Sequence, residues 1–236
     1  MSITRQFNNP PDKIKFATIA YIWSTFHGGI ILTATAFYFI LGELWPPLLA
    51  GNLSFLVLLL LGFHYYFRQD SFGVANLLTL TRLLSIFLLM FYFDSLNNAT
   101  LAAAGFLILL SDGLDGRLAR RYRRTSLFGE YFDKETDAFF MYVLCLMIIE
   151  RNLMGAWVVL LGAMRYLFAL FIFFYHTEVR KERRSRFGRY VFVVVILALL
   201  SAFLPIPAVY APLIILAAII LFYSFGRDIV WILLKR

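Results

Sequence analysis

The sequence predicts an all-α protein, a polytopic bundle of membrane-spanning helices. Of its 236 residues, 61% are apolar and only 15% are charged, whereas soluble domains contain about 45–50% and about 25% of these classes. The mean hydropathy is +0.78, and the apolar residues form runs close to the ~20 residues that a helix needs to cross a bilayer. This composition excludes a soluble single domain, and its aromatic content excludes intrinsic disorder.

Eight apolar runs predict eight spans. The first run is too long for the apolar region of a cleaved signal peptide, so we expect it to remain in the protein. The predicted spans are 17–41, 46–67, 76–93, 99–118, 127–149, 153–175, 189–206 and 209–233.

The net charge of +8 is distributed unevenly along the chain. Basic residues gather in 1–16, 117–124 and 180–189 and at the carboxyl terminus, whereas the alternate connections are short and nearly uncharged. Because cytoplasmic loops are enriched in Lys and Arg, eight spans place both termini and the basic loops in the cytoplasm, at the inner membrane if the source is bacterial. Topology thus explains the positive charge without a nucleic-acid partner. The single Cys145 excludes an internal disulfide and a multi-cysteine metal site.

Acidic residues concentrate where the fourth predicted span leaves the membrane and the fifth enters it. Six of the 14 acidic residues lie from Asp112 to Asp137. Asp112 and Asp115 are spaced i, i+3, and Gly129, Asp133 and Asp137 are spaced i, i+4, i+8, so each set shares a helix face. Two antiparallel helices could bring the aspartate pairs face to face. Such hard oxygen donors suit Mg²⁺, Mn²⁺ or Ca²⁺.

These residues also form a recognisable motif. The chain reads D-G-L-D-G-R-L-A-R from Asp112 to Arg120, then Gly129, Asp133 and Asp137. It resembles the signature of the CDP-alcohol phosphotransferase family, D-x2-D-G-x2-A-R-x8-G-x3-D-x3-D, and every fixed position matches. The resemblance implies a six-span catalytic domain over 71–236. The two spans within 1–70 lie outside it, and we expect them to form an amino-terminal extension.

The resemblance also implies a reaction in phospholipid biosynthesis. An acceptor alcohol attacks the β-phosphate of a CDP-linked lipid, most simply CDP-diacylglycerol, and CMP leaves. The implied cofactor is Mg²⁺ or Mn²⁺, as two ions, with Asp137 either sharing in the metal site or acting as the base. By this analogy the metal ligands are Asp112, Asp115 and Asp133, with Asp137 as a fourth if it shares in the metal site. The residues lining the nucleotide site are Gly116, Ala119, Arg120 and Gly129.

Further candidates lie outside the motif. Asn76 and Thr79 belong to a segment similar to the family's P-N-x-L-T-x-x-R, with Ala75 in place of the proline, and they either contact the nucleotide or make helix caps and interhelical hydrogen bonds. A lone arginine inside a span, Arg165, is expected to bind an acceptor phosphate or to pair with an acid. Arg186 and Arg189, beside the seventh span, are the other candidates for that phosphate.

One residue off the motif stripe and the choice of partners complete the predictions. Glu135 lies two residues from each motif aspartate, so it should point away from them and toward basic neighbours. The acceptor is a small alcohol, and a phosphorylated one such as glycerol 3-phosphate or inositol phosphate is favoured. A homodimer is common in the family. The alternatives are a divalent-cation transporter and a non-catalytic membrane scaffold that retains the motif.

Overall fold

A computed structural model describes the backbone of residues 10–63, 73–122, 127–175, 186–204 and 206–234, and the side chains of these ranges except 10–17, 112–122, 127, 186 and 207. Eight long helices dominate it, and the described residues contain no strand, which confirms the all-α prediction. The helices are α1 (Pro10–Leu41), α2 (Trp45–Gly62), α3 (Gly73–Phe91), α4 (Asn98–Tyr122), α5 (Leu127–Glu150), α6 (Val159–Phe174), α7 (Arg186–Ser201) and α8 (Pro207–Leu234). Two short 3₁₀ segments, η2 (Phe93–Ser95) and η3 (Ala156–Val158), precede α4 and α6.

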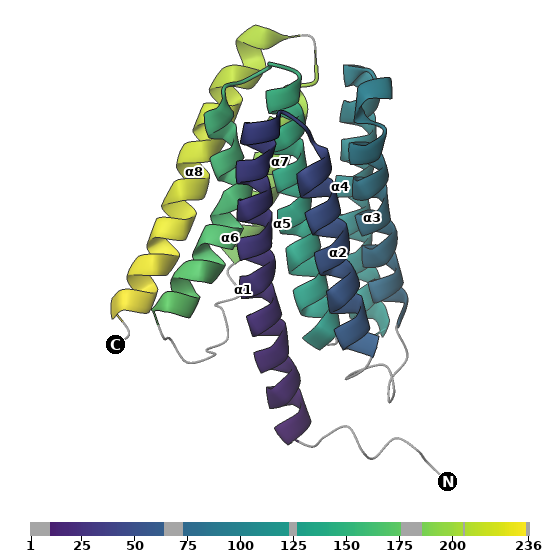
Figure 1. The fold of residues 1–236 in the computed structure, drawn as a ribbon, viewed down its shortest axis with the longest axis vertical. Coiled ribbons are helices and arrows are strands. Elements are labelled where there is room, and N and C mark those ends of the chain that lie inside the picture. The colour runs from purple at the N-terminus through teal and green to yellow at the C-terminus, as the bar shows by residue number, and fades with distance from the viewer. Residues whose placement is uncertain (1–9, 64–72, 123–126, 176–185, 205, 235–236) are drawn as a thin grey trace.

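Successive helices run in opposite directions, so the bundle has two distinct ends (Figure 1). The beginning of α1 and the end of α8 lie at the same end of the bundle. We call this the motif end, because α5 begins there and carries its motif aspartates in its first turns. The position of both of these helix ends on the same side agrees with an even number of membrane crossings.

Helix α5 occupies the centre of the bundle (Figure 1), packed between α3 and α6 and also in contact with α1 and α7. Ten consecutive residues, from Phe139 to Ile148, are each at most 7% exposed, as expected for a helix that is surrounded on all sides. Cys145 is one of these buried residues. Gly162 of α6 permits a close approach, because a Cβ there would lie 2.5 Å from Tyr142 Cα.

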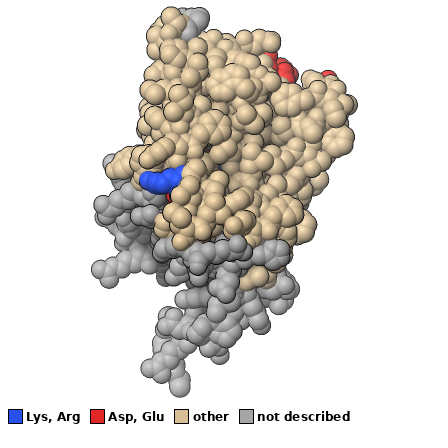
Figure 2. Space-filling view, turned by 90° about the vertical axis from the view of Figure 1, so that its left-hand side faces the viewer, with Lys and Arg blue, Asp and Glu red and all other residues tan. Residues whose placement is uncertain are grey.

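Among the residues whose side chains are described, five segments are long and apolar enough to cross a membrane: Thr18–Leu41, Trp45–Gly62, Gly73–Phe91, Ala156–Phe174 and Ala208–Leu234. The described apolar parts of α4 and α7, Asn98–Ser111 and Phe187–Ser201, are shorter, and α5 carries five charged residues within its first 11 positions. On the face seen in Figure 2, the described surface is almost free of charged atoms. The protein is therefore an integral, multi-pass membrane protein, and five of the eight predicted spans meet the length and apolarity requirement.

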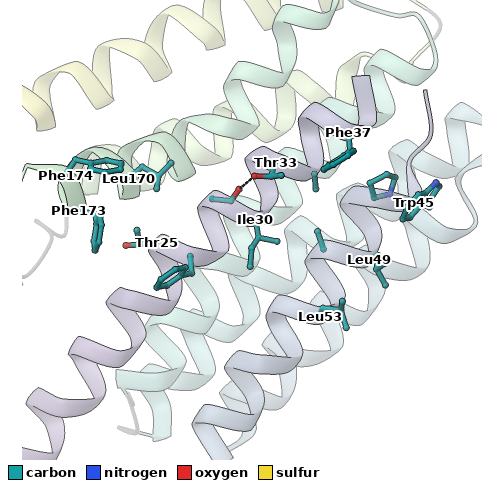
Figure 3. A pocket seen from close by; sticks show the side chains of 15 residues that line it. Thr25, Ile30, Thr33, Phe37, Trp45, Leu49, Leu53, Leu170, Phe173 and Phe174 are labelled. Carbon is teal, nitrogen blue, oxygen red and sulfur yellow. Dashed lines mark hydrogen bonds between the residues drawn. The ribbon is translucent and has the colours of Figure 1, made fainter. Parts of the chain in front are cut away.

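An apolar groove of about 670 Å³ lies between α1, α2 and α6 (Figure 3). Its walls include Ile30 and Phe37 of α1, Leu49 and Leu53 of α2, and Phe173 of α6. None of the described side chains that line it is acidic or basic. Such an apolar surface suits contact with lipid tails in a membrane.

Candidate functional site

Two motif aspartates are held together by an arginine at the motif end. Arg82 Nη2, from α3, lies 2.6 Å from Asp133 Oδ1 and 2.9 Å from Asp137 Oδ1, both on α5. The arginine side chain is 1% exposed, whereas the aspartate side chains are 42% and 25% exposed. The guanidinium therefore lies beneath the carboxylates, which face the accessible side of the site.

Helical periodicity produces this arrangement. Asp133 and Asp137 are one turn apart on α5, so both side chains reach the neighbouring α3. On α3 the buried face includes Asn76, Thr79 and Arg82. The Thr79 hydroxyl donates to the carbonyl oxygen of Ala75, at 3.2 Å, one turn earlier in its own helix. The two proposed nucleotide contacts thus share a buried face with the arginine that holds the aspartates.

The donor set of the two aspartates fits a divalent cation. Because both Oδ1 atoms contact the same nitrogen, they are no more than 5.5 Å apart, the sum of the two contact distances. Ligand bonds to Mg²⁺ are about 2.0–2.1 Å, so small rotations of the carboxylates would let one ion reach both. Among the described side chains there is no cluster of three or more His, Cys, Asp or Glu.

The first half of the motif lies on α4. Asp112, Asp115, Gly116, Ala119 and Arg120 all belong to this helix, but their side chains are outside the described part of the chain. Only four residues separate the end of α4 from the start of α5, which limits the distance between these helix ends to about 18 Å. Convergence of all four aspartates stays a prediction. Gly129 lies in the first turn of α5, on the aspartate stripe.

Arg165 is paired with another acid of α5, Glu135. Its Nη2 is 2.8 Å from Glu135 Oε1, and the side chain of Glu135 is only 1% exposed. The prediction that Glu135 points toward a basic neighbour is confirmed. Arg165 was expected either to bind an acceptor phosphate or to pair with an acid, and pairing with an acid is the contact observed. Arg189 is exposed near the beginning of α7, and the side chain of Arg186 lies outside the described residues.

Sequence reasoning did not assign two residues that the structure brings to this region. Arg82 occupies the arginine position of the segment similar to the family's P-N-x-L-T-x-x-R, but the sequence did not place it in the site; its signal is a lone basic residue inside an apolar helix. Ser24 of α1 donates a 2.7 Å hydrogen bond to Glu135 Oε1. A single serine in an apolar run has no sequence signal of this kind, because the bond joins residues 111 positions apart.

Comparison with known proteins supports the motif. No curated protein and no solved structure matches the chain significantly. The family model described as CDP-alcohol phosphatidyltransferase matches residues 72–225, about two thirds of the chain. The match includes α3, the two halves of the motif and Arg165, and it excludes α1 and α2. The aspartate-bearing helix pair and its supporting arginine therefore lie within a domain of known type, and the chain belongs to the CDP-alcohol phosphatidyltransferase family.

Proposed function

We propose that this protein transfers a phosphatidyl group from CDP-diacylglycerol to an alcohol acceptor and releases CMP, in phospholipid biosynthesis. The observation that carries the proposal is the pair Asp133 and Asp137, drawn together over a buried arginine at the motif end of an apolar bundle. Acids are costly in a membrane protein and mark function when they cluster. Here they lie within the eight-position motif of a family whose donors are CDP-alcohols.

The reaction needs charge stabilisation on the diphosphate and a base for the acceptor. We propose Asp112, Asp115, Asp133 and Asp137 as ligands for two Mg²⁺ or Mn²⁺ ions, which would neutralise charge on the diphosphate. Asp137 is the proposed base, since a carboxylate beside the acceptor hydroxyl can take its proton. The acceptor oxygen then forms a bond to the β-phosphorus, the bond from that phosphorus to the CMP oxygen breaks, and CMP leaves.

The proposed nucleotide site lies on the faces of α3, α4 and α5 that adjoin the aspartates. Small residues allow a diphosphate to approach the backbone, and an arginine matches phosphate oxygens as a fork. The residues proposed are Gly116, Ala119, Arg120, Gly129, Asn76 and Thr79.

For the acceptor we propose a small phosphorylated alcohol. In the sequence, the basic stretch from 180 to 189 runs into the beginning of α7, and Arg186 and Arg189 are the proposed ligands of the acceptor phosphate. Arg165 can join them only if its guanidinium also reaches beyond Glu135. We further propose that all eight helices cross the bilayer, with the motif end in the cytoplasm, because charged segments of α4 and α5 can be covered by their neighbours.

The decisive experiment measures CMP release by the purified full-length protein. It is incubated with CDP-diacylglycerol, Mg²⁺ or Mn²⁺, and a panel of acceptors that includes glycerol 3-phosphate, inositol phosphate and serine. Asp137→Asn should abolish CMP release while the protein remains folded, because the amide keeps the shape but not the charge or basicity. The matched control is Asp94→Asn, in η2, outside the motif and the proposed site.

Two outcomes would contradict the proposal. Full turnover by Asp137→Asn would remove the assigned role of that residue. No CMP release from the wild-type protein with any acceptor, combined with divalent-cation flux in proteoliposomes that lack CDP-lipid, would favour a transporter.

A further inference from the structure

Of the two helices outside the family match, α1 is joined to the motif helix by a buried polar contact. Glu135 of α5 accepts hydrogen bonds on one oxygen, Oε1, from Ser24 of α1 at 2.7 Å and from Arg165 of α6 at 2.8 Å. Ser24 is 4% exposed and Glu135 is 1% exposed. One carboxylate therefore connects three helices, and one of them belongs to the amino-terminal hairpin α1–α2.

His27, three residues after Ser24 on α1, connects this helix to α2. His27 Nδ1 lies 2.7 Å from the Ser54 hydroxyl, so α1 and α2 are joined at this level. The His27 ring packs edge-on against Tyr166, which follows Arg165 on α6, with centroids 5.5 Å apart. The backbones of α1 and α6 also approach closely here, because a Cβ on Gly28 would lie 3.3 Å from Tyr166 Cβ. The hairpin is thus part of the same packed unit as the motif helix.

Glu135 lies on the face of α5 opposite the aspartates. At 3.6 residues per turn, its side chain projects about 180° from the mean direction of Asp133 and Asp137. Arg82 therefore holds one face of α5 against α3, and Arg165 with Ser24 holds the other face against α6 and α1. Contacts on opposite faces resist rotation of a helix about its axis better than contacts on one face.

Rotation of α5 matters because its aspartates extend outward. A carboxylate oxygen about 6 Å from the helix axis moves about 1 Å for a rotation of 10°. Mg²⁺ requires nearly ideal octahedral geometry, and a 1 Å displacement of a group in an active site can reduce the rate about 100-fold. A small loss of rotational restraint on α5 would thus weaken metal binding before it unfolds the protein.

We propose that Ser24, Glu135 and Arg165 are positioning residues for the metal site, and that the α1–α2 hairpin is required for activity because it supplies one of the contacts that set the rotation of α5. This inference rests on the proposed metal-dependent transfer. It assigns a role to the extension that lies outside the family match.

The test compares the metal dependence of three variants with that of a matched control. Ser24→Ala, Glu135→Gln and Arg165→Lys should each raise the Mg²⁺ concentration for half-maximal CMP release, by about three- to tenfold for the serine, which loses one hydrogen bond to a charged group. The control is Thr35→Val. Thr35 also makes a buried 2.7 Å bond from α1 to α5, to the Tyr142 hydroxyl, but it lies about 16 Å farther along α1. It should lower stability and leave the Mg²⁺ dependence unchanged.

Three results would overturn the proposal. In the first, the Ser24→Ala and Glu135→Gln proteins are folded and show the same Mg²⁺ dependence as the wild-type protein. A second is an equal shift in Thr35→Val, which would show a general packing effect. The third is a raised KM for a phosphorylated acceptor in Arg165→Lys with unchanged Mg²⁺ dependence, which would place Arg165 in the acceptor site.

A readout without substrate separates this proposal from the transfer reaction itself. The unfolding temperature of each variant is measured in detergent across a Mg²⁺ titration, with size-exclusion chromatography as the test of folding. If the wild-type protein releases no CMP but Mg²⁺ raises its unfolding temperature, and Ser24→Ala needs several-fold more Mg²⁺ for the same rise, the reaction assignment fails while the positioning proposal holds. If both proteins respond to the same Mg²⁺ concentrations, the positioning proposal fails.

Discussion

Replacing Arg82 by methionine should make the stability of the protein depend on divalent cations. Methionine has a similar length but no charge, so the carboxylates of Asp133 and Asp137 lose the cation that bridges them. Two charges 5.5 Å apart, the greatest separation the contacts allow, repel by about 3 kcal/mol at an effective dielectric constant of about 20. Since the Asp133 side chain is 42% exposed, solvent screening reduces the expected loss to about 1–2 kcal/mol.

This loss corresponds to a fall of about 5 °C in unfolding temperature, on the scale known for chains of this size. The assay is thermal unfolding in detergent, with either EDTA or millimolar Mg²⁺. Mg²⁺ should restore most of the loss in Arg82→Met, because it replaces the missing positive charge between the carboxylates. CMP release should fall about 10- to 100-fold, as is typical when a partner of metal ligands is removed.

Arg151→Met is the control for this experiment. Arg151 donates to the carbonyl oxygens of Phe93, at 2.9 Å, and Leu96, at 2.6 Å, and it touches no carboxylate in these contacts. Its loss should lower the unfolding temperature, and Mg²⁺ should not restore it. The reasoning is refuted if Mg²⁺ stabilises both variants equally, or if Arg82→Met is as stable as the wild-type protein in EDTA.

Two further predictions concern packing. Gly162→Ala should destabilise the protein by about 1–3 kcal/mol, because its Cβ would meet the Tyr142 backbone at 2.5 Å; Gly29→Ala, with nothing within 4 Å of its Cβ, is the control in the same denaturation assay. Arg151→Met should retain the wild-type CMP release per folded molecule despite its lower stability, because its hydrogen bonds to the carbonyl oxygens of Phe93 and Leu96 support the fold. A large loss of specific activity would contradict this purely structural role.

The helices were predictable because their main signal is local. An apolar run of about 20 residues identifies a buried or membrane-crossing helix wherever its partners lie. The predicted and observed helix boundaries differ where apolar composition does not distinguish a helix from a packed turn. The sixth run was expected to begin at 153, but α6 begins at Val159. Asn152 has a φ of +54°, and Gly155 is extended, so the chain turns before the helix begins.

At α1 the observed helix begins earlier than the predicted span, because the residues before the span are charged. The first predicted span began at 17, but α1 begins at Pro10 and continues through Asp12, Lys13 and Lys15. Proline is favoured at the first helical position, and charges do not stop a helix that lies at the end of a bundle. A span prediction measures apolarity, so it locates the segment that suits the membrane and not the whole helix.

The candidate site was predictable to the extent that it lies on single helices. The stripe of Gly129, Asp133 and Asp137 follows from helical spacing alone. Which helix faces that stripe does not, because pairing between helices depends on how side chains from distant parts of the sequence fit together. The contacts of Arg82 with the aspartates and of Ser24 with Glu135 were therefore not available from the sequence.

The choice of partners for the two arginines separates their roles. Arg82 and Arg165 are both arginines on apolar helices next to α5, and each needs a carboxylate because an unpaired charge in this environment is costly. Arg82 shares two carboxylates whose side chains remain 42% and 25% exposed, so a ligand can approach these carboxylates. Arg165 pairs with a carboxylate that is 1% exposed, so Glu135 is closed to a ligand from solvent. The accessible carboxylates beside Arg82 suit a site that binds and releases a metal or substrate. The buried pair of Arg165 and Glu135 suits a permanent contact between helices.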